Sequence, residues 1–351
     1  MMPTETMLSG LQVVEVAQGV AGPMCGKVFA DLGAEVTRVE PPGGDWLLKV
    51  AADGGARALY DQLNAGKRKL SLDLAAPAGR ASLAALVSSA DVLVVGEREA
   101  KLTKLGLDAA SLCHGAPRVV YCHVSGWGSG GPMGDKAASE LAIQVVTGMT
   151  RYLGTLGEPP VRQGIDLVAV DTGIAAAQAA LAALLWRETS GTGQRVEVSM
   201  LATAIALMQW DTTAFSGPEA WEGRQLTADQ WSEDHGFQLA DARCLIDLRS
   251  RESGWSDLLR ELGCPDLADD PRLQTEHGLD LTIPDLPRLT AGRLTQWTFA
   301  EVEPMVRDKY QGTIVPMLDY RQVLEHPQIR HLGLVTPGAV PRVRFPMDMK
   351  S

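Results

Sequence analysis

Several segments carry residue types that bind phosphates or attack carbonyl carbons, and each has a known spacing for comparison. The first turn has glycines at a spacing other than GxGxxG, which argues against a nicotinamide dinucleotide site. These glycines are Gly19, Gly22 and Gly26. Gly66 and Lys67 lack the earlier glycine and the hydroxyl of a phosphate-binding GxxxxGKS/T loop. Trp127 stands where the GxSxG motif of serine hydrolases needs its first glycine. All three chemistries are therefore disfavoured.

Metal ligands and thiols are scattered along the chain. The six histidines and five cysteines form no HExxH motif and no CxxC pair. The odd number of cysteines favours reduced thiols, which are typical of the cytoplasm. We therefore expect no metal site and a structural role for each histidine.

Carboxylates are the remaining reactive groups, and three of them lie before or within an Ala- and Leu-rich segment at residues 171–189. Asp171 opens this segment and is expected in the first turn of a helix, where the helix dipole favours an ionised carboxylate. Asp166 lies shortly before it, and Glu140 lies in the sequence SELAIQVVTG. The ordinary roles of Asp171 and Glu140 are a helix cap and a hydrogen-bonded support.

The elements that would position these groups alternate between strand and helix. Short runs rich in β-branched residues predict buried strands. The expected strands are residues 11–16, 35–39, 91–95, 119–124 and 194–199. The order predicts an α/β protein with a doubly wound sheet that has helices on both faces. Ligands bind such sheets beyond the carboxyl ends of the strands, so the loops after Val16, Val39, Val95 and Val124 are the first candidates.

Length and charge exclude some classes of function. The 351 residues favour two domains, and the net charge of -11 disfavours nucleic acid or an anionic membrane as the main partner. The start of the chain has no signal-peptide pattern, and the apolar stretch at residues 174–186 is too short to span a bilayer. We expect a cytoplasmic protein.

Six segments, in order, resemble CoA-transferase family III, the CaiB/BaiF group that contains formyl-CoA transferase. They are LSGLQVVEVAQGVAGP, FADLGAEVTRVEPPGGD, NAGKRKLSLDL, ADVLV followed by KLGL, SGWGSGGP, and AALLWRETSGTGQRVEVSM. The later segments DPRL and EHPQIRHLG also fit. Any one segment is weak evidence, but six in the same order are strong.

The resemblance implies a Rossmann-like large domain made from both chain ends, a smaller α+β domain, and an interlocked dimer. On this basis we predict that residues 1–215 begin the large domain, that residues 216–315 form a linker and the small domain, and that residues 316–351 return to the large domain. The implied activity moves CoA from an acyl-CoA thioester to a carboxylic acid through an active-site aspartate. Coenzyme A and acyl-CoA are then substrates, with no metal.

The resemblance also implies a frame of residues that bind CoA. Its members are Gln18, Arg38, Leu72 and Lys104. Without the family, Arg38 and Lys104 would be read as solvated surface cations. Where many members have Asn-Phe, this chain has Gly96 and Glu97, which removes an aromatic surface and adds a negative charge near the expected phosphates.

The nucleophilic aspartate of the family falls at Ala169, four residues before Gly173, and an alanine cannot form the anhydride. Two hypotheses follow. In the first, a CoA-transferase uses Asp171 or Glu140 instead. In the second, the chain is a non-catalytic subunit of a heteromeric transferase, paired with a sister family III chain. An α-methylacyl-CoA racemase is least favoured, because Ser139 replaces the histidine of its catalytic pair and Ala169 the aspartate.

Overall fold

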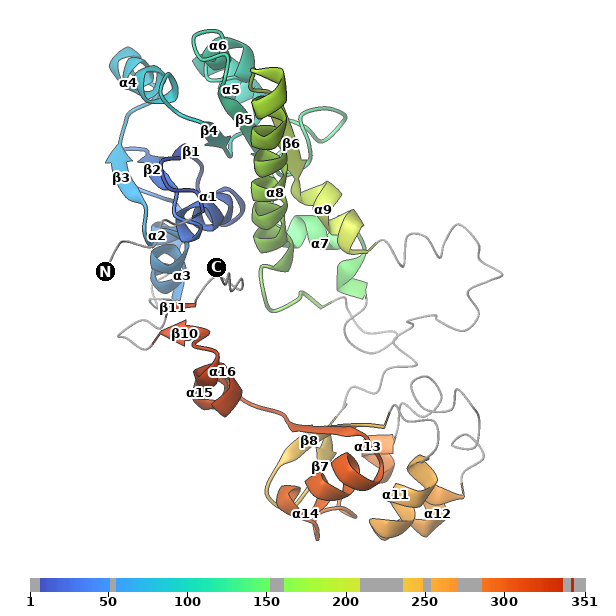
Figure 1. The fold of residues 1–351 in the computed structure, drawn as a ribbon. Coiled ribbons are helices and arrows are strands. Elements are labelled where there is room, and N and C mark those ends of the chain that lie inside the picture. The colour runs from blue at the N-terminus through green and yellow to red at the C-terminus, as the bar shows by residue number, and fades with distance from the viewer. Residues whose placement is uncertain are drawn as a thin grey trace, which may run out of the picture. The chain divides into compact units, whose positions relative to one another are not determined.

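The chain divides into two compact units in a computed structural model, and each unit is described by itself (Figure 1). The structure describes residues 7–50, 55–151, 161–208, 236–248, 254–269, 286–336 and 342–343. The first unit comprises Met1–Met149, Arg162–Trp210 and Gly333–Ser351, and the second comprises Thr150–Val161 and Asp211–Leu332. The predicted boundary at residues 215/216 lies outside the described residues, and the one at 315/316 stays a prediction.

A parallel sheet of six strands forms the centre of the first unit, in the order β3-β2-β1-β4-β5-β6. The strands are β1 (Gln12–Val16), β2 (Glu35–Glu40), β3 (Arg68–Ser71), β4 (Val92–Val95), β5 (Val120–Ser125) and β6 (Arg195–Ser199). This is the order of dinucleotide-binding folds, and it reverses direction between β1 and β4. The predicted mixed α/β class is thereby confirmed.

Helices cover both faces of the sheet, because neighbouring residues of each strand point to opposite sides. Val13 of β1 packs in a core with α1 and α8, whereas Val14 packs in a second core with α4, α5 and α6. The helices of this unit are α1 (Ala21–Asp31), α2 (Leu47–Val50), α3 (Gly55–Leu63), α4 (Pro77–Val87), α5 (Glu99–Leu105), α6 (Ala109–Cys113), α7 (Glu140–Val146), α8 (Leu167–Ser190) and α9 (Met200–Leu207). A short 3-10 helix at Met149–Arg151 begins at the last residue of this segment and continues into the second unit.

Helix α8 is the longest element and packs against α1, β5 and β6. A Cβ at Gly173 would lie 2.5 Å from the Ala21 carbonyl oxygen, so glycine lets α8 approach α1 closely. The helix has 24 residues and is longer than the apolar stretch on which the bilayer argument rested. By length and composition alone it could cross a membrane, but half of its most apolar window is buried, as in a core helix.

The second unit has an antiparallel sheet of three strands, in the order β7-β8-β9, packed against short helices around its own core. Its strands are β7 (Phe237–Gln238), β8 (Arg243–Asp247) and β9 (Thr313–Pro316). Its helices are α11 (Trp255–Glu261), α12 (Pro265–Ala268), α13 (Leu286–Leu289), α14 (Phe299–Pro304), a π-helical turn at Met305–Lys309, α15 (Tyr320–Glu325) and α16 (Pro327–His331). Helix α16 begins directly after α15, at a proline. Proline starts helices well at their first position, and Pro327 holds that position here.

The C-terminal segment of the first unit forms a small antiparallel pair, β10 (Val335–Thr336) with β11 (Arg342–Val343). The side-chain amide of Gln62 in α3 exchanges two hydrogen bonds with the backbone of Val343, at 2.9 and 3.3 Å. The DPRL segment and the Trp-rich part of the predicted linker lie outside the described residues.

Candidate active site

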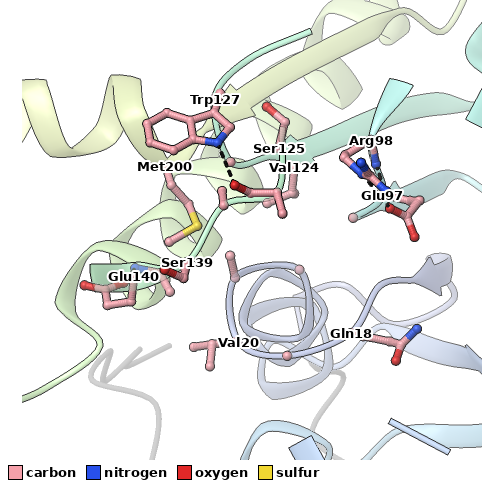
Figure 2. A pocket seen from close by; sticks show the side chains of 18 of the residues that line it. Gln18, Val20, Glu97, Arg98, Val124, Ser125, Trp127, Ser139, Glu140 and Met200 are labelled. Atoms are coloured by element: carbon pink, nitrogen blue, oxygen red, sulfur yellow. Dashed lines mark hydrogen bonds and ion pairs between the residues drawn. The ribbon is translucent and has the colours of Figure 1, made fainter. Parts of the chain in front are cut away.

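A cavity of about 580 Å³ opens beyond the carboxyl ends of β1, β4 and β5 (Figure 2). It lies at the point where the strand order reverses, which is where doubly wound sheets bind their ligands. The loops after Val16, Val95 and Val124 all contribute to its wall, as predicted. The loop after Val39 contributes Trp46.

The side of the cavity beside β1 and β4 carries polar groups (Figure 2). Gln18 lines the wall and is exposed, and its amide oxygen accepts a hydrogen bond from the backbone N–H of Trp46 at 3.2 Å. Arg98 donates to the Asp135 carbonyl oxygen at 2.9 Å. The Glu97 carboxylate lies 3.8 Å from Arg98 and is paired with Lys101, so the extra negative charge is offset locally.

The long loop after β5 forms another wall. The Trp127 indole donates to the Ala137 carbonyl oxygen at 3.1 Å, which fixes the loop on itself. Lys136 lines the cavity and is exposed, and among the described residues its ammonium has no ion-pair partner. His123 of β5 also lines the cavity, although its side chain is almost fully buried, and its Nε2 lies 2.7 Å from the Glu97 carbonyl oxygen.

Glu140 lies at the other side of the cavity, together with Ser139 and Met200 (Figure 2). It opens α7, where Ser139 accepts a capping hydrogen bond from the Ala142 N–H. The Glu140 carboxylate also caps α8. Its Oε1 accepts from the Val168 N–H at 3.0 Å, and its Oε2 accepts from the Ala169 N–H at 2.8 Å. Gln144 donates to Oε1 at 2.8 Å. Backbone N–H groups at a helix start favour such a carboxylate.

The prediction that Asp171 lies in the first turn of the helix is wrong. Helix α8 begins at Leu167, so Asp171 lies in its second turn, and it does not line the cavity. The physical reason is that Glu140 supplies the acceptor for the first N–H groups from another helix, so no local cap at Asp171 is needed. Ala169 itself lines the cavity beside the Glu140 carboxylate.

Arg38 is fully buried and does not line the cavity. Its guanidinium pairs with the carboxylates of Glu15, Glu40 and Asp45, and the Nε to Glu40 distance is 2.8 Å. Lys67 shares Glu15 with it at 2.7 Å. The structure therefore places Arg38, a predicted CoA contact, in a buried ion network outside the cavity wall.

The buried network shifts the pKa of several members. Burial disfavours the charged guanidinium, but the neighbouring carboxylates outweigh it and raise the pKa of Arg38. Burial also opposes ionisation of Glu40, yet hydrogen bonds from Tyr60 and Arg38 outweigh it and lower the pKa of this carboxyl. Burial lowers the pKa of the Lys67 ammonium, with Glu15 opposing the change. The network therefore favours the charged form of Glu40.

The other two members of the predicted CoA frame lie outside the cavity wall. Leu72 follows β3, is half-buried and packs on the core beneath α4. Lys104 is exposed in the last turn of α5. The cavity thus gathers Gln18 and Glu140 from the predicted set, and it leaves Arg38, Leu72, Lys104 and Asp171 outside its wall.

Sequence reasoning missed several polar or aromatic side chains of the wall, and three of them are large groups that follow expected strands. They are Trp46, Arg98 and Lys136. All three lie in loops that follow expected strands, and these loops were predicted to bind the ligand. Their position after a strand could therefore have identified them. The described residues contain no group of three or more His, Cys, Asp or Glu side chains that could hold a metal ion.

The fold and the cavity define a Rossmann-like α/β protein with a cavity at the carboxyl ends of its parallel strands, where doubly wound sheets bind ligands. The chain belongs to CoA-transferase family III, whose family model matches residues 8–351. The resemblance found in the sequence is therefore confirmed.

Individual relatives agree with this family. A succinate–glutarate CoA-transferase of Agrobacterium fabrum is 37% identical over 213 residues, which are 57% of this chain and 52% of that protein. The chain thus spans about half the length of this relative. A probable fatty acyl-CoA transferase of Mycobacterium tuberculosis is 28% identical over 83% of this chain and 78% of its own. The crystal structure of a CAIB/BAIF family protein from Brucella suis has a TM-score of 0.82 and 26% identity, covering 98% of this chain and 93% of that one.

Proposed function

We propose that the cavity binds an acyl-CoA thioester and that this chain transfers the CoA to a carboxylic acid, with Glu140 as the nucleophile. One observation carries the assignment to Glu140. Its Oε2 lies 2.8 Å from the backbone nitrogen of Ala169, the position to which the family resemblance assigns the nucleophilic aspartate. The carboxylate therefore reaches that part of the cavity from a neighbouring helix.

The transfer proceeds in balanced steps. Glu140 attacks the thioester carbonyl carbon, the C–S bond breaks, and CoA leaves as a thiolate, which gives an acyl–glutamyl anhydride. The thiolate then attacks the Glu140 carbonyl carbon and releases the first carboxylate product. Attack of the acceptor carboxylate on the resulting glutamyl-CoA thioester, followed by return of the thiolate, regenerates Glu140 and forms the new acyl-CoA.

Binding of CoA is supported by the chemistry of the opposite side of the cavity. Ala21 and Gly22 lie in the first turn of α1, where N–H groups lack partners within the helix and can bind anionic oxygens. Arg98 and Lys136 add positive charge to the wall, which suits phosphate groups. In this proposal Arg98 and Lys136 supply the cationic contacts to CoA, because Arg38 is buried outside the cavity wall.

The test is CoA exchange between a panel of acyl-CoA donors and carboxylic acids, with hydroxylamine trapping of the enzyme adduct. Glu140→Gln should abolish exchange and the adduct, and should lower the free energy of unfolding by about 1–3 kcal/mol because two N–H groups lose an anionic acceptor. Asp171→Asn should leave both unchanged. Loss of exchange in D171N but not in E140Q would assign the reaction to Asp171 instead.

A second candidate is a non-catalytic subunit that pairs with a catalytic sister chain. The observation that favours it is the three hydrogen bonds that Glu140 accepts, because they make this carboxylate a cap for α8 while Ala169 supplies no nucleophile. This candidate predicts no exchange by the purified chain and strong exchange after mixing with a family III chain that has the aspartate. Exchange by the chain alone would exclude it.

We also propose a dimer, either of two copies or with a sister chain. Helix α7 supports this, because Leu141, Val145 and Val146 are exposed there by 44–60%. Exposed apolar side chains gathered on one helix are typical of association surfaces. The five free cysteines fit a reducing compartment, and we propose the cytoplasm.

A further inference from the structure

An ion pair between Arg162 and Asp166 lines the cavity just before helix α8, and the proposed chemistry gives it no role. The Arg162 Nη2 lies 2.6 Å from the Asp166 Oδ1, and the arginine side chain is 51% exposed. Exposed ion pairs add little to stability, because water already solvates both charges well. A ligand that enters the cavity can therefore rearrange this pair at little cost.

The pair lies close to the proposed nucleophile, Glu140. Asp166 is the residue immediately before α8, and Ala169 follows three positions later. The backbone nitrogen of Ala169 lies 2.8 Å from the Glu140 Oε2. At a rise of ~1.5 Å per residue, three residues of helix span about 4.5 Å along the axis. The start of α8 thus places Asp166 about one turn from the nitrogen that Glu140 binds.

A buried amide connects the segment that carries Arg162 to the helix that carries Glu140. Gln144 of α7 is fully buried. Its Nε2 donates to the Glu140 Oε1 at 2.8 Å, and its Oε1 accepts a hydrogen bond from the backbone N–H of Gln163 at 3.2 Å. One side chain therefore joins the proposed nucleophile to the residue that follows Arg162. Buried hydrogen-bonded groups of this kind fix the geometry of a site.

We propose that Arg162 binds the second carboxylate of a dicarboxylic acid whose first carboxylate reacts at Glu140, so that the chain selects dicarboxylic acids as acceptors. The inference rests on the proposed function, because it takes Glu140 as the nucleophile. An arginine has five N–H donors, and among the described residues the bond to Asp166 uses only Nη2. The remaining donors can form two parallel hydrogen bonds with a carboxylate.

The charges on this side of the cavity favour the assignment. Glu140 and Asp166 both carry carboxylates, so an acidic group that enters here is repelled unless a cation offsets the charge. Arg162 is the cation beside Asp166. Arg38 shows that a single guanidinium of this protein pairs with three carboxylates at once. Arg162 can therefore keep Asp166 as a partner while it binds a ligand.

The experiment is a competition between two acceptors of equal carbon number, one of which has a carboxylate where the other has a methyl group. The pairs are glutarate with valerate and succinate with butyrate. Both acids of a pair are supplied at equal concentration, with the acyl-CoA donor that the wild type uses best and whose acyl group differs from both. Mass spectrometry measures the two CoA products, and their ratio gives the ratio of the kcat/KM values. The wild type should form mainly the product of the dicarboxylic acid.

Variants of the pair should move this ratio in opposite directions. Arg162→Gln should shift it toward the monocarboxylic acid by roughly ten- to hundred-fold, the effect of losing hydrogen bonds between charged groups. Arg162→Lys keeps the charge but loses the planar fork, so it should fall between. Asp166→Asn should shift the ratio toward the dicarboxylic acid by roughly two- to five-fold, because it removes a carboxylate that competes for Arg162. Among the described residues, the Asp166 side chain makes no capping hydrogen bond to α8, so this variant should fold.

Arg57→Gln is the matched control. Arg57 and Asp61 form an exposed pair with the same spacing, at 3.0 Å in α3, and neither lines the cavity. R57Q should keep the wild-type ratio. An unchanged ratio in R162Q, whatever its overall rate, would overturn the inference and leave the proposed function intact, and so would a wild type that does not favour dicarboxylic acids. A wild type that exchanges CoA with no donor and no acceptor would instead refute the proposed function and the inference with it.

Discussion

At the scale of single residues, Ala169 and Glu140 meet at one side of the cavity. Ala169 contributes only a methyl group to the cavity, while the Glu140 carboxylate binds its backbone nitrogen from α7. Counting from Gly173 predicts that the aspartate implied by the family resemblance is replaced by Ala169. The sequence could not show the hydrogen bond between Glu140 and Ala169, because the two residues lie 29 positions apart and meet only through the packing of two helices.

Restoring the aspartate is the direct test at this scale. Ala169→Asp should raise the rate of CoA exchange by roughly 100-fold or more, since a reacting group misplaced by about 1 Å costs on the order of that factor. An aspartate also suits the first turn of α8, where backbone N–H groups favour an anionic side chain. Initial rates of exchange measure the effect. Ala169→Asn, equal in size but without a carboxylate, is the control, and equal rates in both variants would contradict the prediction.

At the scale of elements, strands and loops differ in how far the sequence predicts them. Buried strands such as β4 are continuous runs of valine and leucine, because both faces of such a strand pack against apolar side chains. These runs make the strand recognisable in the sequence. The edge strand β3 was missed as a strand, because all four of its residues are exposed and two are cationic. Arg38 illustrates the limit for side chains. Its sequence neighbours suggest a ligand contact, but carboxylates from β1, β2 and the following loop converge on it only in the fold.

The ion network that links these elements predicts a specific dependence of stability on pH. The folded protein lowers the pKa of Glu40, so the stability that this group contributes is complete above its ordinary pKa of about 4.5 and is lost as the pH falls through the lower folded value. Glu40→Gln should lower the free energy of unfolding by about 1–3 kcal/mol at pH 7 and should flatten its decline below pH 5. Urea unfolding between pH 7 and pH 3 measures both effects.

Glu35→Gln is the matched control for this prediction, because Glu35 is an exposed acid at the start of the same strand. Its unfolding curve should keep the wild-type dependence on pH. If the free energy of unfolding declines equally with falling pH in E40Q and in the wild type, groups other than Glu40 cause the loss of stability in acid.

At the scale of the whole molecule, the predicted α/β class and the location of the cavity followed from one physical rule. Parallel strands bring their carboxyl ends to a single edge of the sheet. A sequence that alternates strand and helix therefore predicts that its ligand site lies in the loops after the strands. The prediction of a dimer has no such rule behind it, because association depends on which side chains remain exposed after folding. In the structure, helix α7 leaves three apolar residues exposed, and these are the side chains on which the proposed dimer rests.

The proposed dimer can be tested on that helix. Val145 is 56% exposed in α7, and Val145→Asp would place an unpaired carboxylate in any interface formed there. Burying a charge without a partner costs several kcal/mol, so the variant should dissociate to a monomer at concentrations where the wild type is a dimer. Sedimentation velocity measures the two masses directly. Thr189→Asp, a similar change at an exposed position near the end of α8, should leave the assembly unchanged. A monomeric wild type that forms a dimer only with an added family III chain would favour the heteromeric candidate, and a V145D variant that stays dimeric would move the interface away from α7.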